Sequence, residues 1–180
     1  MGFWFIPIRV PTAKVHVQAD RRLAFQLLTA WEAARLDGMP TSKVLEREDD
    51  RLLIQFHTPV KMPFGIRTVQ RTVEWVTTTE PERIEFEGVK GPLPLLLCRW
   101  NLEEWGDCCR FTYDSTFALH GSLLGWLFGA LLIRPLMRRM MREHLEKLKE
   151  TIEARAARSR LFPQRPCPPD EAIGVEAQTA

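Results

Sequence analysis

The sequence predicts an α+β protein in which one antiparallel sheet packs against a long helix near the C-terminus. From residue 42 to 119, segments of alternating apolar and polar residues follow one another with short connections, which is typical of antiparallel strands. Residues 122–157 carry apolar residues at helical spacing, with most charges on the opposite side. A chain of 180 residues is long enough to bury one core. We therefore expect one domain at 13–160, an apolar lead-in at 1–12, and a Pro-rich, disordered tail at 161–180.

The first predicted elements are a strand and a helical segment. At 14–19, Val15 and Val17 alternate with polar neighbours, which indicates a strand. Asp20 then offers an N-cap for residues 21–36, whose apolar side chains fit one or two short helices, and we expect two. The sequence Asp-Gly-Met-Pro that follows has the composition of a turn.

Six further strands are predicted in succession. They cover residues 42–48, 51–58, 65–78, 83–89, 95–105 and 108–119. In the segment 65–78, Val69, Val73 and Trp75 alternate with polar residues, so we expect these three side chains to form the apolar, inward face. In the last strand the alternation continues through Leu119.

The stretch after the last strand raises the question of a membrane span. Residues 115–133 carry no formal charge, which approaches the ~20 residues of a spanning helix, and the glycines in this stretch recur every four residues. Because the strand extends through Leu119, only residues 122–133 remain, and a run this short indicates a buried helix. Pro135 is expected to kink this helix or to end its apolar first piece.

Composition argues against several kinds of partner and site. The formal net charge is +2, and the basic cluster RRMMR is followed at once by acidic residues, so no nucleic-acid surface is expected. The four cysteines, Cys98, Cys108, Cys109 and Cys167, have no C-x-x-C spacing, and neighbouring cysteines seldom bridge each other. We therefore expect a reducing compartment, a cytoplasmic protein and no structural zinc.

The N-terminal segment places Phe3, Trp4, Phe5 and Ile6 side by side. It lacks the basic region, the long apolar core and the cleavage site of a signal peptide. We expect it to cover one end of the sheet. A peripheral contact with a membrane or a partner through Phe3, Trp4 and Phe5 is the alternative.

Three phrases of the sequence resemble a known superfamily. "VHVQADRRLAFQLL" is similar to its opening strand and helix, "TTTEPERIEFEGVKGPLPLLLCRWNLEEWGDCCRFTYDSTF" to its middle strands, and "GALLIRPLMRRMMREHLEKLKETIE" to its closing helix. Together they resemble the START / Bet v 1-like (SRPBCC) superfamily, in its polyketide cyclase and coenzyme Q-binding-like branch, over residues 13–157. The resemblance implies the helix-grip fold, in which a curved antiparallel sheet wraps the last helix around a cavity.

The function implied by this resemblance is the binding or carrying of a hydrophobic small molecule, such as a lipid, a quinone or a polyketide-like chain. No cofactor and no metal are expected. The candidate ligand-binding residues are aromatic strand residues and residues of the closing helix, namely Trp31, Phe56, Trp75, Phe86, Trp100, Tyr113, Phe117, Trp126, Gly129, Ile133, Arg134 and Met137. The alternative is an ordinary filled core, since aromatic residues at strand spacing usually form one.

Residues suited to catalysis are scarce. The four histidines show no metal-ligand spacing, and neither a G-x-S-x-G motif nor a phosphate-binding loop occurs. No catalytic residue is therefore assigned, and binding is favoured over turnover, with Tyr113 and Arg134 as the polar end of the pocket. Two alternatives stay open. One is a polyketide cyclase or aromatase that uses the same cavity, and the other is a membrane-peripheral protein that docks through the N-terminal aromatic segment and the closing helix.

Overall fold

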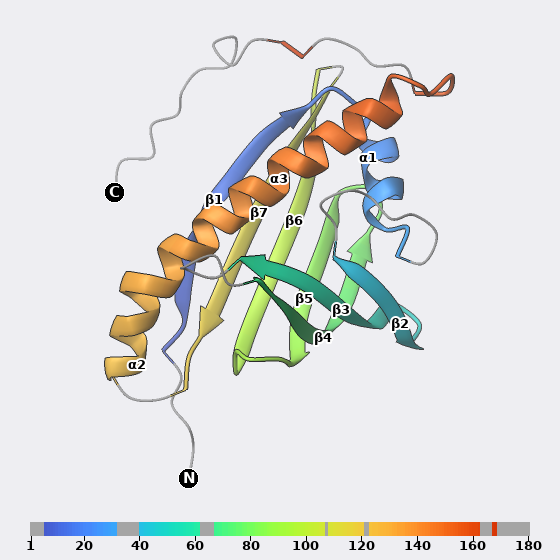
Figure 1. Cartoon of the computed structure of the whole chain (residues 1–180). Helices are drawn as coiled ribbons and strands as arrows, with labels where there is room; N and C mark the ends of the chain where they lie inside the picture. The colour runs from blue at the N-terminus through green and yellow to red at the C-terminus, as the bar shows by residue number, and fades with distance from the viewer. Residues whose placement is uncertain are drawn as a thin grey trace.

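A seven-stranded antiparallel sheet curves around one long helix in this protein, as a computed structural model shows (Figure 1). The structure describes residues 6–31, 40–61, 67–106, 108–120, 123–162 and 167–168. In chain order the elements are β1 (Ile8–Val17), α1 (Arg21–Leu28), β2 (Thr41–Arg47), β3 (Arg51–Lys61), β4 (Arg67–Thr79), β5 (Arg83–Lys90), β6 (Leu95–Trp105), β7 (Cys108–Ala118), α2 (Leu123–Phe128), η2 (Gly129–Ile133) and α3 (Arg134–Ala156). The predicted α+β class is confirmed.

The strands stand in the order β1-β7-β6-β5-β4-β3-β2, and every neighbouring pair is antiparallel. From β2 to β7, strands that follow each other in the chain also pair with each other, which short turns allow. Across the predicted Asp49–Asp50 turn, the Glu48 N–H donates to the Arg51 carbonyl at 2.9 Å. All six strands predicted between residues 42 and 119 are present.

One short helix, α1, follows β1. The Asp20 carboxylate accepts a hydrogen bond from the Arg22 N–H at 2.7 Å and so caps the helix, as predicted. The helix ends at Leu28, where both the backbone N–H of Thr29, at 3.0 Å, and its hydroxyl, at 2.8 Å, donate to the Phe25 carbonyl. Two short helices were predicted here, and one is seen in the described residues. Residues 32–39, where the second would lie, are outside the described residues.

The closing helix is continuous through α2, η2 and α3. The segment η2 is π-helical, and the Arg134 N–H bonds to the Gly129 carbonyl, five residues back. This wider turn directly precedes Pro135, which has no N–H and would crowd the carbonyl four residues earlier in a regular α-helix. We expected a kink, or the end of the apolar first piece, at Pro135; the structure has a π-helical turn there, and the helix continues into α3. In the described ranges, no helix is both long and apolar enough to cross a bilayer.

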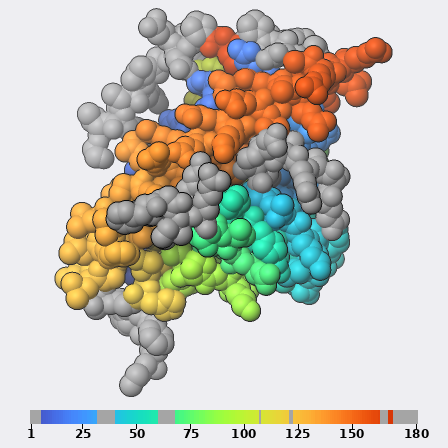
Figure 2. All heavy atoms as spheres, viewed as in Figure 1, coloured from blue at the N-terminus to red at the C-terminus, as the bar shows by residue number. Residues whose placement is uncertain are grey.

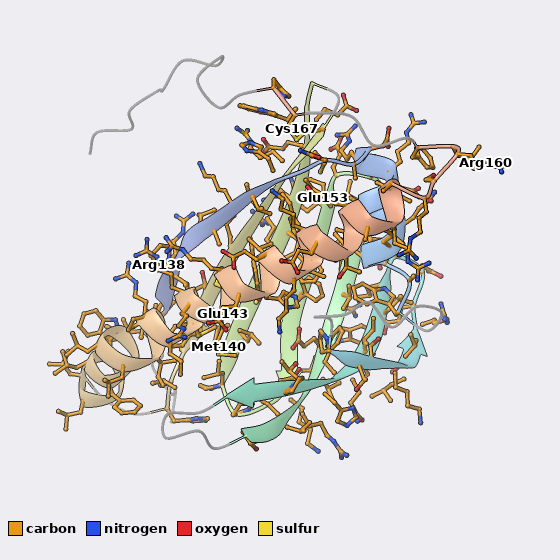
Figure 3. All side chains as sticks on the ribbon, turned by 45° about the horizontal axis from the view of Figure 1, so that its top comes forward. Arg138, Met140, Glu143, Glu153, Arg160 and Cys167 are labelled. Atoms are coloured by element: carbon orange, nitrogen blue, oxygen red, sulfur yellow. A yellow bond between two sulfur atoms is a disulfide. The ribbon has the colours of Figure 1, made fainter. Side chains whose placement is uncertain are left out.

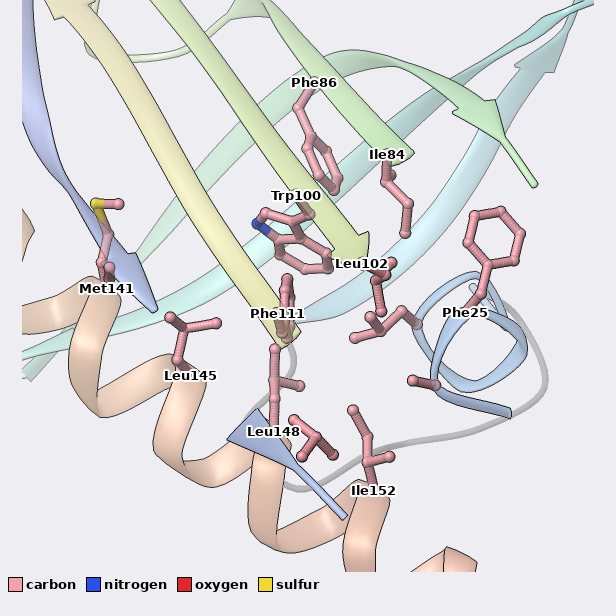
Figure 4. Close-up of a cluster of buried hydrophobic side chains, with 14 of the residues drawn as sticks. Phe25, Ile84, Phe86, Trp100, Leu102, Phe111, Met141, Leu145, Leu148 and Ile152 are labelled. Atoms are coloured by element: carbon pink, nitrogen blue, oxygen red, sulfur yellow. The ribbon is translucent and has the colours of Figure 1, made fainter. Parts of the chain in front are cut away.

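The core lies between the concave face of the sheet and the helices α1 and α3. Leu145, Leu148 and Ile152 point from α3 toward the sheet, where Phe111 is completely buried (Figure 4). The side of α3 that faces the core is the apolar side predicted from helical spacing. A hydrogen bond of 2.8 Å from the Gln18 N–H to the Glu153 carboxylate fixes α3 at the end of β1.

A disulfide joins Cys108, at the start of β7, to Cys167. Pro168 lies against the β6–β7 turn, because a Cβ added at Gly106 would sit 3.2 Å from the Pro168 Cγ. Gly106 has φ of 60°, a conformation that glycine adopts without strain. The sequence analysis did not predict this disulfide, because cysteines far apart in the chain meet only in the fold. Of the predicted tail, only residues 161, 162, 167 and 168 are described.

Candidate functional site

The inner face of β4 carries polar side chains. Thr72 and Glu74 are each only 8% exposed, and Val76 beside them is also buried. Trp75 lies on the outer face, where the Arg51 guanidinium carbon stands 4.2 Å from the centre of its ring. The prediction that Val69, Val73 and Trp75 face inward was therefore wrong. Alternation shows which side chains share a face, but the position of α3 decides which face is the interior.

Glu74 is the buried carboxyl group of this site. The Thr72 hydroxyl donates to its Oε1 at 2.6 Å. Burial raises the pKa of the Glu74 carboxyl, and the hydrogen bond from Thr72 opposes this rise. The interior of the sheet therefore contains an acid whose protonated form is favoured more than in water.

Further polar atoms face the interior from β6 and β7. Cys98 and Ser115 are directly opposite each other, with 3.4 Å between Sγ and Oγ, and the Tyr113 hydroxyl lies 3.8 Å from the same sulfur. Burial raises the pKa of the Cys98 thiol to about 11, and the charge of Glu74 adds to the rise. Burial also raises the pKa of Tyr113 well above its usual value, with further contributions from Cys98 and Glu74, while Trp100 opposes the rise. The thiol of Cys98 and the hydroxyl of Tyr113 are therefore uncharged at neutral pH.

Aromatic rings fill the concave face next to these groups. Trp31 contacts Phe56 and Phe86 edge to face, with ring centres 5.9 and 6.1 Å apart. Phe86 is 4.8 Å from Trp100, and Trp100 is 5.8 Å from Tyr113. Five of the predicted ligand-binding residues thus form one continuous series of ring contacts. Figure 4 shows Phe86 and Trp100 above α3 in this cluster.

The indole N–H of Trp100 has no hydrogen-bond partner among the described residues, although Trp100 is only 5% exposed. Trp100 also acts to lower the pKa of Tyr113, whose ring centre lies 5.8 Å from that of Trp100. A buried donor without a partner is costly, and few occur in native proteins. This N–H is therefore available to an acceptor oxygen on a ligand.

An open depression lies beside Glu74. It is shallow and, as it stands, far too small to enclose a drug-sized ligand. Thr72 lines it together with Gly88, the residue paired with Glu74 across β4 and β5. The remaining lining comes from the strand ends and the connection between β5 and β6, namely Gln70, Lys90, Gly91, Pro92, Leu93 and Leu96.

The other predicted ligand-binding residues lie elsewhere. Phe117 is completely buried near Gly129, whose added Cβ would stand 3.5 Å from the Phe117 ring. Ile133 and Met137 are half-buried against the core, and Trp126 is 37% exposed. Arg134 is exposed on the closing helix, whereas Tyr113 faces the interior of the sheet beside Cys98. The structure therefore does not bring Arg134 and Tyr113 together as one polar end.

Sequence reasoning missed Thr72, Glu74, Cys98 and Ser115. Glu74 stands between the apolar residues Val73 and Trp75, so alternation predicts that its side chain faces solvent. No signal in the sequence would have reversed that assignment, because it depends on which face α3 covers. Within the described part of the chain, no three His, Cys, Asp or Glu residues are placed so that they could hold a metal ion.

The sequence also matches a protein-family model, in agreement with this fold. Residues 10–153 match the family model described as "Polyketide cyclase / dehydrase and lipid transport". The chain belongs to this family. The match covers most of the domain from β1 to α3, so the resemblance to START / Bet v 1-like proteins is confirmed. No curated protein matches the chain.

Solved structures with the same fold include the protein TTHA0849 from Thermus thermophilus, with a TM-score of 0.66 and 20% identity over 82% of this chain and 99% of that one. The Zhui aromatase/cyclase from a Streptomyces species has a TM-score of 0.59 and 13% identity over 85% and 95% of the two chains. A START superfamily protein from Mycobacterium smegmatis has a TM-score of 0.57 and 15% identity over 82% and 97%. At these identities the likeness establishes the fold.

Proposed function

We propose that this protein binds a mostly apolar small molecule that carries a hydroxyl or carbonyl group. The observation that carries the proposal is the buried Glu74 carboxyl, whose hydrogen-bond partner Thr72 lines an open depression. A protonated carboxyl both donates and accepts hydrogen bonds, so it suits either group on a ligand. The indole N–H of Trp100, which has no geometric hydrogen-bond acceptor among the described residues, offers a second donor in the same interior.

The apolar body of the ligand would lie against the aromatic rings. Phe86 and Trp100 stand next to the polar groups and present ring surface rather than further hydrogen bonds. The family description supports an apolar ligand, because it names both polyketide cyclisation and lipid transport. The depression is small as it stands, so binding of a larger ligand requires side chains such as Leu93 and Leu96 to move.

The proposal is tested with a matched pair of probes, 2-naphthol and naphthalene, by measuring their dissociation constants. We expect 2-naphthol to bind about tenfold more tightly, because a buried hydrogen bond contributes roughly 1.5 kcal/mol. Glu74→Leu should remove this preference and leave the affinity for naphthalene nearly unchanged.

Glu87→Leu is the control, since Glu87 is exposed on the neighbouring strand β5. It should leave both affinities unchanged. Equal affinity of the unmodified protein for the two probes, or binding of neither, would contradict the proposal. Organic extraction and native mass spectrometry of the purified protein would then identify the natural ligand.

Turnover of a polyketide-like chain in the same site is the second candidate function. It is favoured by the buried acid Glu74, because burial raises the pKa of this carboxyl and so favours the protonated form that a general acid needs. The aromatase/cyclase among the similar structures supports this alternative. Product formation from an added polyketide analogue, lost in Glu74→Gln with ligand affinity retained, would establish turnover over simple binding.

A further inference from the structure

The segment α2–η2 exposes a large apolar surface. Leu124 is 76% exposed, Leu131 65% and Phe128 51%. Six exposed apolar side chains of this segment recur one and four residues apart and so share one side of the helix: Leu123, Leu124, Leu127, Phe128, Leu131 and Leu132; Trp126, at 37%, is exposed outside this group. The segment protrudes at one end of the molecule, and its side chains project into open space (Figures 2 and 3).

The opposite side of the same segment is apolar as well and is used in the fold. Gly129 is buried against the side chains of Ile8 and Leu119. The helix therefore has no polar side in this segment, unlike a surface helix of a globular domain. A contiguous exposed apolar patch of this kind marks an interaction site.

The charged residues that follow this surface along the helix are all basic up to Arg142. From residue 115 to 142 the chain has no Asp or Glu. Four arginines follow the apolar face directly along the helix, and all four are exposed: Arg134, Arg138, Arg139 and Arg142. The first acidic residue is Glu143, which pairs with Arg139 at 2.8 Å. An exposed apolar helix end with adjacent arginines is complementary to a surface that is apolar inside and negatively charged at its rim.

We propose that α2–η2 docks on an anionic phospholipid bilayer, with its exposed leucines and Phe128 among the acyl chains and Arg134, Arg138 and Arg142 at the lipid phosphates. The segment Leu123–Ile133 would be about 16 Å long at ~1.5 Å per residue, roughly half of a hydrocarbon core, so it lies in the interface. A second copy of this chain is a poorer occupant, because this face has no carboxylate to receive the arginines before Glu143.

Vesicle flotation tests the proposal with the full chain. We expect the protein to float with vesicles of phosphatidylcholine and phosphatidylglycerol in equal amounts, to float much less with phosphatidylcholine alone, and to lose binding as salt rises. Leu124→Gln/Leu131→Gln should lower the partition coefficient at least about tenfold. Arg138→Gln/Arg142→Gln should lower it about fivefold per arginine on anionic vesicles and leave the weak binding to phosphatidylcholine unchanged.

Matched controls come from other exposed residues. Leu45→Gln/Val69→Gln changes two apolar residues of β2 and β4 that are 46% and 64% exposed, and Arg22→Gln/Arg158→Gln changes two exposed arginines. Neither pair should alter flotation, and all variants should melt within a few degrees of the unmodified protein.

Two results would overturn the proposal. One is failure of the unmodified protein to float with anionic vesicles. The other is a dimer in sedimentation velocity that Leu124→Gln/Leu131→Gln converts to a monomer without any change in flotation, which would assign the face to self-association. Neither result bears on the affinity for 2-naphthol, so the docking proposal and the ligand proposal fail separately.

Discussion

Glu74 gives the interior of this protein its distinctive chemistry. It lies on the concave face among aromatic rings, with Thr72 as its hydrogen-bond partner. Trp75, its neighbour in the chain, points the opposite way and packs against Arg51. A single step along a strand therefore separates a buried acid from a surface indole.

A pH-dependent stability difference follows from the raised pKa of Glu74. Because the folded chain holds this proton more tightly than the unfolded chain, the stabilisation it provides is complete below the unfolded pKa of about 4.5 and is lost as pH rises through the folded pKa. Glu74→Gln removes this loss. We expect the variant to be more stable than the unmodified protein at neutral pH, and the difference to vanish at low pH.

Denaturant unfolding at a series of pH values measures this difference. Glu87→Gln, on the exposed side of β5, should show no comparable trend. A Glu74→Gln variant that is less stable at neutral pH would mean that the carboxylate has a stabilising partner in the folded protein.

At the scale of secondary structure, the closing helix meets the sheet at Gly129. A glycine inside a helix either leaves room for a ligand, as the choice of Gly129 as a ligand-binding residue implied, or lets the helix approach the sheet closely. A Cβ at this position would lie 2.5 Å from the Ile8 Cδ1 and 3.0 Å from the Leu119 Cδ1. The space beneath Gly129 is therefore filled by side chains of β1 and the end of β7, and the expected room at this position was wrong.

Gly129→Leu should destabilise the protein by about 1–3 kcal/mol or more, because the added side chain overpacks this contact. Gly129→Ala should be close to neutral. Its methyl displaces only the ends of Ile8 and Leu119, and alanine is about 1 kcal/mol better than glycine in a helix. Thermal melting of both variants tests this expectation. An unchanged or higher melting temperature for Gly129→Leu would show that space lies beneath the helix.

At the scale of the whole molecule, the Cys108–Cys167 disulfide ties the C-terminal segment to the β6–β7 turn. The link closes a loop over a sequence separation of 59 and so encloses β7 and the whole closing helix. A cross-link over a loop of this length restricts the unfolded chain and stabilises the fold by roughly 4 kcal/mol in the chain-entropy model. From composition alone, the tail would be expected to contribute almost nothing.

Cys108→Ser/Cys167→Ser should therefore lower the melting temperature of the oxidised protein by on the order of 10 °C. Removal of residues 162–180 should have a similar effect, since it removes Cys167. Dithiothreitol should lower the melting temperature of the unmodified protein and leave that of the double variant unchanged. Equal melting temperatures for the oxidised protein and the double variant would show that the disulfide does not stabilise the fold.

Periodicity in the sequence determined the α+β class, the six strands from β2 to β7, the side of α3 that faces the core, and the N-cap of α1. These features depend on residues close together in the chain, which share an element and its repeat. The predicted rings Trp31, Phe56, Phe86 and Trp100 also come together, because they belong to the buried faces of their elements.

Only the tertiary structure decided the chemistry of the interior. It turned Glu74 inward, placed Arg134 at the surface, filled the space under Gly129, joined Cys108 to Cys167 and left the leucines of α2 uncovered. Each of these outcomes depends on which distant element covers a given face. A strand or helix has two faces, and its own sequence does not specify which one its neighbours will bury.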